Sequence, residues 1–112
     1  MDWVTDVVSL AEEFLFQSIS NRPTIIDIYE FCDRWGLQLA VGYAPRPRGC
    51  VLGNCIVAHA PDSGALTRVC IHEITEWLLR QEILPPFQYI PSGHDDRHKV
   101  ACAVEKHLRN MK

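Results

Sequence analysis

The sequence predicts an α+β fold in one domain over residues 1–112, with helices toward both ends of the chain and a small sheet between them. Apolar residues recur every three or four positions near both ends, which is typical of helices with one buried face. In the middle they alternate with other residues beside Gly and Pro, which is typical of strands and tight turns. With 112 residues, 47% of them hydrophobic and 22% charged, the chain has the size and composition of a domain with a single core.

Two helices are expected before the sheet. The first covers about Asp2–Ser20, and Asn21-Arg22-Pro23 then breaks its apolar pattern. Thr24 is a suitable N-cap for the second helix, Ile25–Trp35. Gly36 is a suitable stop for that helix, because glycine tolerates the left-handed backbone that ends many helices.

The central segment predicts an antiparallel sheet of about three strands. Pro45 and Pro47 interrupt the strand pattern, and Gly53-Asn54 is a two-residue turn between two apolar runs. The expected strands are Leu37–Val41, Cys50–Leu52 and Cys55–His59.

Two longer helices are expected after the sheet. Pro61–Gly64 is predicted as a loop, and Leu66–Leu84 as a helix that Pro85-Pro86 ends. Phe87–Gly93 is predicted as a second loop, after which a helix runs from Asp95 to the C-terminus. The apolar stripe expected on this last helix is Val100, Val104, Leu108 and Met111.

The longer of these helices carries the motif His72-Glu73-Ile74-Thr75-Glu76. His72 and Glu76 are four residues apart, so their side chains project from one face of the helix and can reach the same metal ion. Glu73 lies one position round the helix, where its carboxylate can hold and deprotonate a water bound to that ion. Apolar residues flank this polar pair, which indicates that it points into a second packed layer or a cleft.

The predicted third ligand is His98, near the start of the last helix. Two histidines and one carboxylate are a common ligand set of catalytic zinc, which leaves a position for water or substrate. His94 is an alternative to His98, which is preferred because a helix fixes the direction of its side chain. Glu105 lies roughly 10 Å beyond His98 along the helix and is expected to support the site from outside or to lie on the surface. His59 and His107 are not assigned to the site.

Charge and cysteine usage exclude several other classes of protein. A net charge of −3 gives no basic stripe for nucleic acid or for an anionic membrane. The chain shows no spanning segment and no signal peptide, so a cytoplasmic protein is expected. Its five cysteines match no zinc-knuckle spacing and are expected to be free thiols.

These segments together resemble the ImmA/IrrE family of metallopeptidases from about Pro23 to Leu108. Pro23–Leu37 resembles the family's short helix, Cys55–His59 its last strand, and Arg68–Leu79 its active helix, which carries HExxH. In that family the third ligand is a glutamate three residues before an alanine on the next helix, and His98 stands three residues before Ala101. Relative to the family, histidine and glutamate have therefore exchanged positions.

The resemblance implies a minimal zincin-like metallopeptidase in which His72, Glu76 and His98 hold Zn²⁺, with Mn²⁺ as a second choice, and Glu73 is the general base. It also implies a protein substrate, such as a helix-turn-helix repressor in phage or mobile-element regulation. Direct contact with nucleic acid is not expected, because of the net charge. Tyr89 and His94 are candidate hydrogen-bond donors to the transition state. Two alternatives stay open. The chain can be a catalytically inactive binding module, or a helical interaction domain without metal, which requires the three ligands to lie apart.

Overall fold

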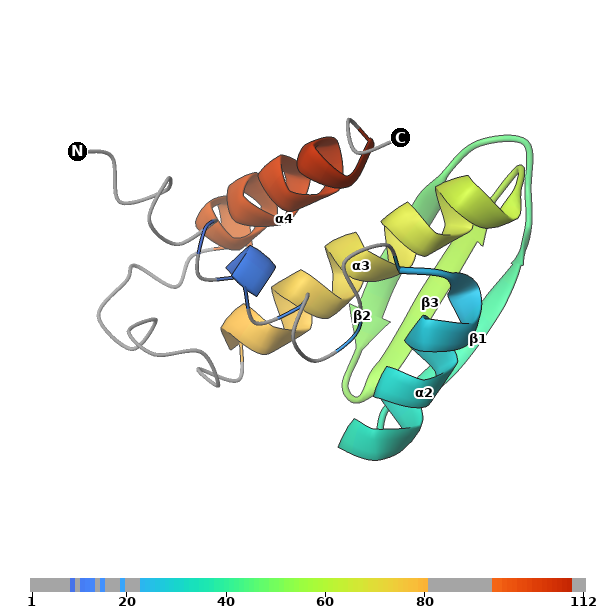
Figure 1. Ribbon diagram of the computed structural model, residues 1–112, viewed down its shortest axis with the longest axis horizontal. Helices are drawn as coiled ribbons and strands as arrows, with labels where there is room; N and C mark the ends of the chain where they lie inside the picture. Colours follow the sequence, from blue (N-terminus) through green and yellow to red (C-terminus); the bar gives the residue numbers. More distant parts are fainter. Residues whose placement is uncertain are drawn as a thin grey trace.

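The computed structural model describes residues 9, 11–13, 15, 19, 23–80 and 94–109, with backbone alone at 94–97 and 107–109 (Figure 1). Its elements are α2 (Ile25–Trp35), β1 (Gln38–Tyr43), β2 (Arg48–Leu52), β3 (Cys55–Ala60), α3 (Ser63–Arg80) and α4 (His94–Arg109). The predicted α+β class is confirmed. Within the first predicted helix, residues 9, 11–13 and 15 are helical and residue 19 is in a turn, and its other residues lie outside the described part of the chain.

Helix α2 has the bounds that its local sequence predicts. The Thr24 side chain accepts a hydrogen bond from the backbone N–H of Asp27, and the Asp27 carboxylate accepts one from the Thr24 N–H at 2.8 Å. This reciprocal capping box satisfies two backbone donors at the start of the helix. At the other end, Gly36 adopts φ 71°, a left-handed conformation that favours glycine.

The three strands form a mixed sheet in the order β1-β3-β2. β2 and β3 are the expected antiparallel hairpin, with Leu52 opposite Cys55 and a turn in which Gly53 has φ 60°. β1, however, pairs parallel with β3, with Gln38 opposite Cys55 and Tyr43 opposite Ala60. The prediction of a wholly antiparallel sheet is therefore wrong for β1.

The connection between β1 and β2 explains this difference. A tight hairpin between them needs a short turn of residues such as Asn and Gly, whereas the four connecting residues 44–47 include Pro45 and Pro47. Neither proline has a backbone N–H to donate to a ladder. The connection instead crosses two strand spacings, about 10 Å, and leaves room for β3 between its neighbours.

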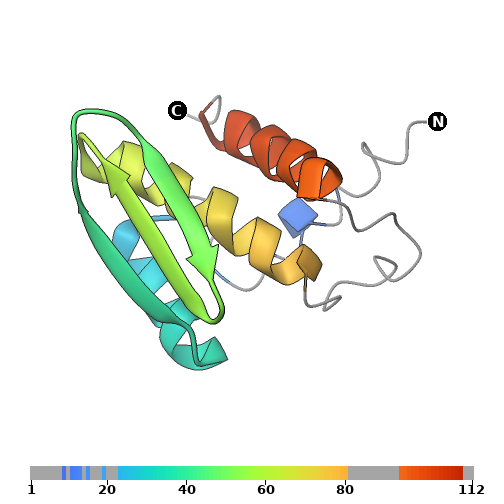
Figure 2. The same ribbon diagram turned by 180° about the vertical axis from the view of Figure 1, so that it is seen from behind.

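Helix α3 lies at the centre of the molecule. Figure 1 shows α2 and α3 on one face of the sheet and α4 along the side of α3 away from it, whereas the described helices leave the opposite face uncovered (Figure 2). Every residue of α3 from Ala65 to Leu79 except Arg68 is buried. Ile56, Ala58 and Ala60 of β3, Phe31 of α2 and Val100 and Val104 of α4 complete the core around it. The predicted covering of α3 on both sides is confirmed.

Helix α3 begins three residues before the predicted start. The Asp62 carboxylate accepts a hydrogen bond of 2.8 Å from the Ala65 N–H, and the Asp62 carbonyl accepts one of 2.9 Å from the Leu66 N–H. Asp62 is thus an N-cap, which offsets the low helix propensity of Gly64. The predicted end of this helix at Pro85-Pro86 and the loop Phe87–Gly93 lie outside the described residues. Within the described part of the chain, no helix has the length and apolar character needed to cross a bilayer.

Candidate metal centre

The buried face of α3 toward α4 carries His72 and Glu76. They are only 8% and 6% exposed, although imidazole and carboxylate groups are costly to bury without partners. The i,i+4 spacing places the His72 Nε2 atom 3.1 Å from Glu76 Oε2. The helix therefore presents one nitrogen and one oxygen at the same point, as predicted.

Helix α4 brings His98 to this point from the other side. The His98 Nδ1 atom lies 3.3 Å from His72 Nε2 and 3.9 Å from Glu76 Oε2. The two imidazole rings meet edge to face, with centroids 4.9 Å apart and planes at 64°. The predicted convergence of these three side chains is observed, which argues against the alternative that needs them to lie apart.

The spacing of the three atoms fits a metal ion. Ligands at 2.0–2.3 Å from a tetrahedral zinc ion are separated from one another by about 3.3–3.8 Å. The observed separations of 3.1, 3.3 and 3.9 Å lie close to this range. Two imidazoles and a carboxylate suit zinc and are also tolerated by manganese. These residues can therefore hold such an ion with small side-chain movements.

The second nitrogen of His72 has its own partner on α4. Its Nδ1–H donates to Glu105 Oε2 at 3.2 Å. His98 and Glu105, two turns apart on α4, thus contact opposite sides of the same ring. A carboxylate on Nδ1 fixes the imidazole tautomer and directs Nε2 toward the ion site. The predicted role of Glu105 as a supporting residue agrees with this contact.

These contacts also change the protonation of His72. Burial alone disfavours the imidazolium, but hydrogen bonds to Glu105 and Glu76 outweigh it and raise the pKa of His72 from 6.5 to about 9. At neutral pH and without metal, the ring is therefore charged and donates from both nitrogens.

Glu73 lies beside the same point and is 6% exposed. One of its carboxylate oxygens is within 4.8 Å of a His72 ring nitrogen and of a Glu76 oxygen. Burial, followed by the negative charge of Glu76, raises the pKa of Glu73 above its usual range. A carboxylate with a raised pKa is a stronger base, which suits proton transfer at neutral pH.

A cavity of about 270 Å³ opens above these residues. It is lined by Gly49, Cys50 and Val51 of the edge strand β2, by His72, Glu73, Glu76 and Arg80 of α3, and by His98 of α4. A Cβ atom at Gly49 would lie 2.8 Å from Val69 Cγ1 and 3.0 Å from Glu73 Cγ. Glycine at this position therefore lets β2 approach α3 without displacing Glu73.

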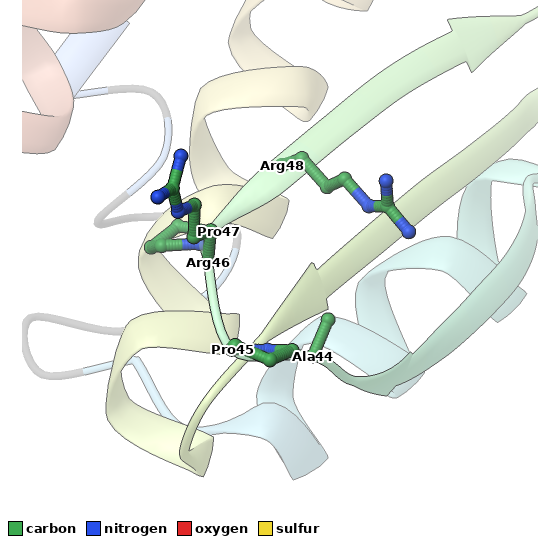
Figure 3. A pocket seen from close by; sticks show the side chains of 5 residues that line it. All are labelled: Ala44, Pro45, Arg46, Pro47 and Arg48. Atoms are coloured by element: carbon green, nitrogen blue, oxygen red, sulfur yellow. The ribbon is translucent and has the colours of Figure 1, made fainter.

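A larger hollow of about 470 Å³ lies at the connection between β1 and β2 and is lined by Ala44, Pro45, Arg46, Pro47 and Arg48. The two arginine side chains point in different directions, so they do not form one anion clamp (Figure 3). Pro47 and Arg48 also border a smaller hollow that reaches His72, Glu73, His98 and Glu105. The connection is thus a wall of the candidate centre, whereas the larger hollow contains no candidate base or nucleophile.

Other residues considered from the sequence are placed differently. His59 lies on β3 opposite Gly42 and packs over it, so that a Cβ at Gly42 would be 3.1 Å from the His59 ring. Tyr89 and the side chains of His94 and His107 lie outside the described residues. All five cysteines are free thiols, as predicted.

Sequence reasoning missed one side chain at the centre. The Cys102 Sγ atom lies 3.4 Å from His98 Nε2. The signal was the spacing of four residues between His98 and Cys102, which places both side chains on one face of α4.

No family model, curated protein or solved structure matches this chain.

Proposed function

We propose that the chain is a metal-dependent peptidase with a zincin-like core of the ImmA/IrrE type. The observation that carries the proposal is the convergence of His72 Nε2, Glu76 Oε2 and His98 Nδ1 within 3.9 Å, from two helices and inside a cavity. In this proposal the three residues hold Zn²⁺, or alternatively Mn²⁺. When bound, the ion supplies a Lewis acid that polarises a peptide carbonyl and acidifies a water molecule.

The protein side chains transfer the proton, orient the ligands and form the cavity. Glu73 accepts the proton of the attacking water and delivers it to the leaving amine. Glu105 keeps one proton on His72 Nδ1, so that Nε2 is the nitrogen that binds the ion once it has lost its own proton. β2 forms one wall of the cavity, and Gly49 keeps that wall close to Glu73. The proposed substrate is a protein, and by the resemblance a helix-turn-helix repressor encoded by the same genome.

The test is a comparison of Glu73→Gln with Glu30→Gln, a matched change at an exposed position of α2. Both variants and the parent are loaded with zinc or manganese, analysed for metal content, and incubated with the repressor, with cleavage followed on a gel. Glu73→Gln should keep its metal, because the three proposed ligands are intact. Its cleavage should fall by at least the roughly 10²–10⁴-fold that loss of a general base costs, while Glu30→Gln should resemble the parent.

The same comparison distinguishes the peptidase from an inactive binding module. If Glu73→Gln still binds the repressor and keeps the full biological effect, the chain acts by binding and the peptidase proposal is wrong. If His72→Ala and His98→Ala bind as much metal as the parent, the proposed centre is wrong.

A further inference from the structure

Cys102 is an exposed thiol at the edge of the candidate centre. It stands one turn after His98 on α4, and its Sγ lies 3.4 Å from His98 Nε2. His98 is itself accessible, with a side chain that is 55% exposed. Both groups can therefore change rotamer without disturbing the core.

The thiol completes a second group of ligand atoms. One ring nitrogen of His72, one of His98 and the Cys102 Sγ all lie within 4.8 Å of one another. Ligands of a tetrahedral zinc ion are about 3.3–3.8 Å apart, so these side chains need to close by at most about 1.5 Å to bind one ion. Because the side chains of His98 and Cys102 are exposed, they can adopt other rotamers that allow this movement.

We propose that Cys102 is a metal ligand in a second set, His72, His98 and Cys102, that overlaps the set His72, Glu76 and His98. This inference rests on the metal-binding part of the proposed function and does not require catalysis. The two sets share both histidines, so one ion occupies one set or the other. As the sulfur–metal bond forms, the thiol proton leaves to solvent.

The two sets differ in the ions that they favour. A carboxylate oxygen is a hard ligand that suits Mn²⁺, whereas a thiolate is a soft ligand that suits Zn²⁺, Cd²⁺ and Co²⁺. The centre should therefore prefer thiophilic ions more strongly than a site of two histidines and one carboxylate does. Removing the sulfur should weaken Cd²⁺ binding much more than Mn²⁺ binding.

Cobalt substitution tests the inference directly, because Co²⁺ absorbs in two informative regions. Bands in the visible region report bound, low-coordinate Co²⁺, and a sulfur-to-cobalt charge-transfer band in the near ultraviolet reports a thiolate ligand. Co²⁺ is added anaerobically to the reduced full chain, to Cys102→Ser and Cys102→Ala, and to Cys50→Ser. Cys50 is the matched control because it is exposed and lines the cavity from β2.

The parent should show both kinds of band. Both Cys102 variants should keep the visible bands and lose the charge-transfer band, and Cys50→Ser should keep both. Glu76→Gln should also keep the charge-transfer band, because the second set does not use the carboxylate. In a parallel titration, the Cd²⁺ affinity of Cys102→Ser should fall by at least the roughly 10–100-fold typical of losing a residue that only orients a ligand.

The failures of the two proposals are distinguishable. Visible bands without a charge-transfer band in the parent would overturn the role of Cys102 and leave the peptidase site intact. A charge-transfer band that disappears in Cys50→Ser and persists in Cys102→Ser would assign the sulfur to β2 and overturn the inference as well. Absence of any cobalt band in the parent would refute the shared histidine site and both proposals with it.

Discussion

Metal affinity is expected to rise steeply between pH 7 and pH 8.5, because a proton on His72 competes with the ion. The Nε2 atom that would bind the ion instead carries a hydrogen donated toward Glu76, and Nδ1–H donates to Glu105. These two contacts raise the pKa of His72 to about 9, against the opposing effect of burial. The ion can bind Nε2 only after that proton has left.

The size of the effect follows from the pKa. At pH 7 a group with a pKa of about 9 is deprotonated in about 1% of molecules, and at pH 8.5 in about 24%, so affinity should rise about 20-fold over this range. With an ordinary pKa of 6.5 the same change in pH would alter affinity by only about 1.3-fold. Protons released by other ligands would steepen the rise. The charged and titratable groups around His72, among the described residues, are Glu73, Glu76 and Arg80 on α3, His98, Cys102 and Glu105 on α4, and Arg48 from β2.

The assay is competition for Zn²⁺ against a chromophoric chelator, whose own pH dependence is measured without protein. Glu105→Gln should flatten the curve, because it removes one of the two charges that hold the proton on His72. Glu30→Gln, an exposed change of the same type on α2, should leave the slope unchanged. A change of less than about twofold between pH 7 and 8.5 in the parent would refute this account of His72.

Three further predictions concern stability, each measured by urea unfolding with EDTA present. The pKa of His72 is about 9 in the folded protein and 6.5 in the unfolded chain, so its contribution to the free energy of unfolding is complete below pH 6.5 and is lost as pH rises through 9. This loss of stability should reach up to about 3 kcal/mol. In His72→Gln the pH-dependent loss should be smaller. Gly49→Ala should cost about 1–3 kcal/mol through overpacking, because the added Cβ would lie 2.8 Å from the Val57 carbonyl oxygen and from Val69 Cγ1. Gly53→Asn, at a left-handed position with no atom within 4 Å of an added Cβ, should cost less than about 1 kcal/mol. Asp62→Ala should cost about 0.5–2 kcal/mol by removing the N-cap of α3, and an unchanged unfolding midpoint would show that Asp62 does not cap the helix.

Local sequence signals predicted the elements whose boundaries depend on local chemistry. Helix α2 begins and ends where Thr24 and Gly36 predict, because a cap and a left-handed glycine act within one turn of the chain. Asp62 is the same kind of signal and was missed, because the neighbouring Gly64 favoured a loop over a helical first turn.

Pairing between distant segments was less predictable. Alternation in β1 identifies a strand but carries no information about the direction of its partner. The parallel pairing of β1 with β3 depends on how Pro45 and Pro47 direct the connection to β2. A sequence pattern with period two is compatible with either direction, so the decisive information lies in those two loop residues.

The candidate centre was predictable to the extent that helix spacing determines it. The spacing of His72 and Glu76 placed them on one face, and the position of His98 early in the next helix placed it opposite. The contact of Glu105 with His72 Nδ1 depends on the packing of α3 against α4, which sequence spacing does not give. The contact of Cys102 with His98, in contrast, follows from their i,i+4 spacing on α4 and could have been predicted from the sequence.

In the proposed metal site, the exchange of histidine and glutamate relative to the family that the sequence resembles changes which helix supplies each ligand, but not the charge of the set. Two neutral imidazoles and one carboxylate contribute −1 in either arrangement, so the electrostatic effect on a metal-bound water is the same to a first approximation. The exchange does change the burial and the contacts of the carboxylate and of the imidazole. The carboxylate of Glu76 now lies on the buried helix α3, 6% exposed, and the imidazole of His98 lies on the more accessible helix α4. On α4 the two ring nitrogens of His98 face different partners: Nδ1 lies 3.3 Å from His72 Nε2, and Nε2 lies 3.4 Å from Cys102 Sγ.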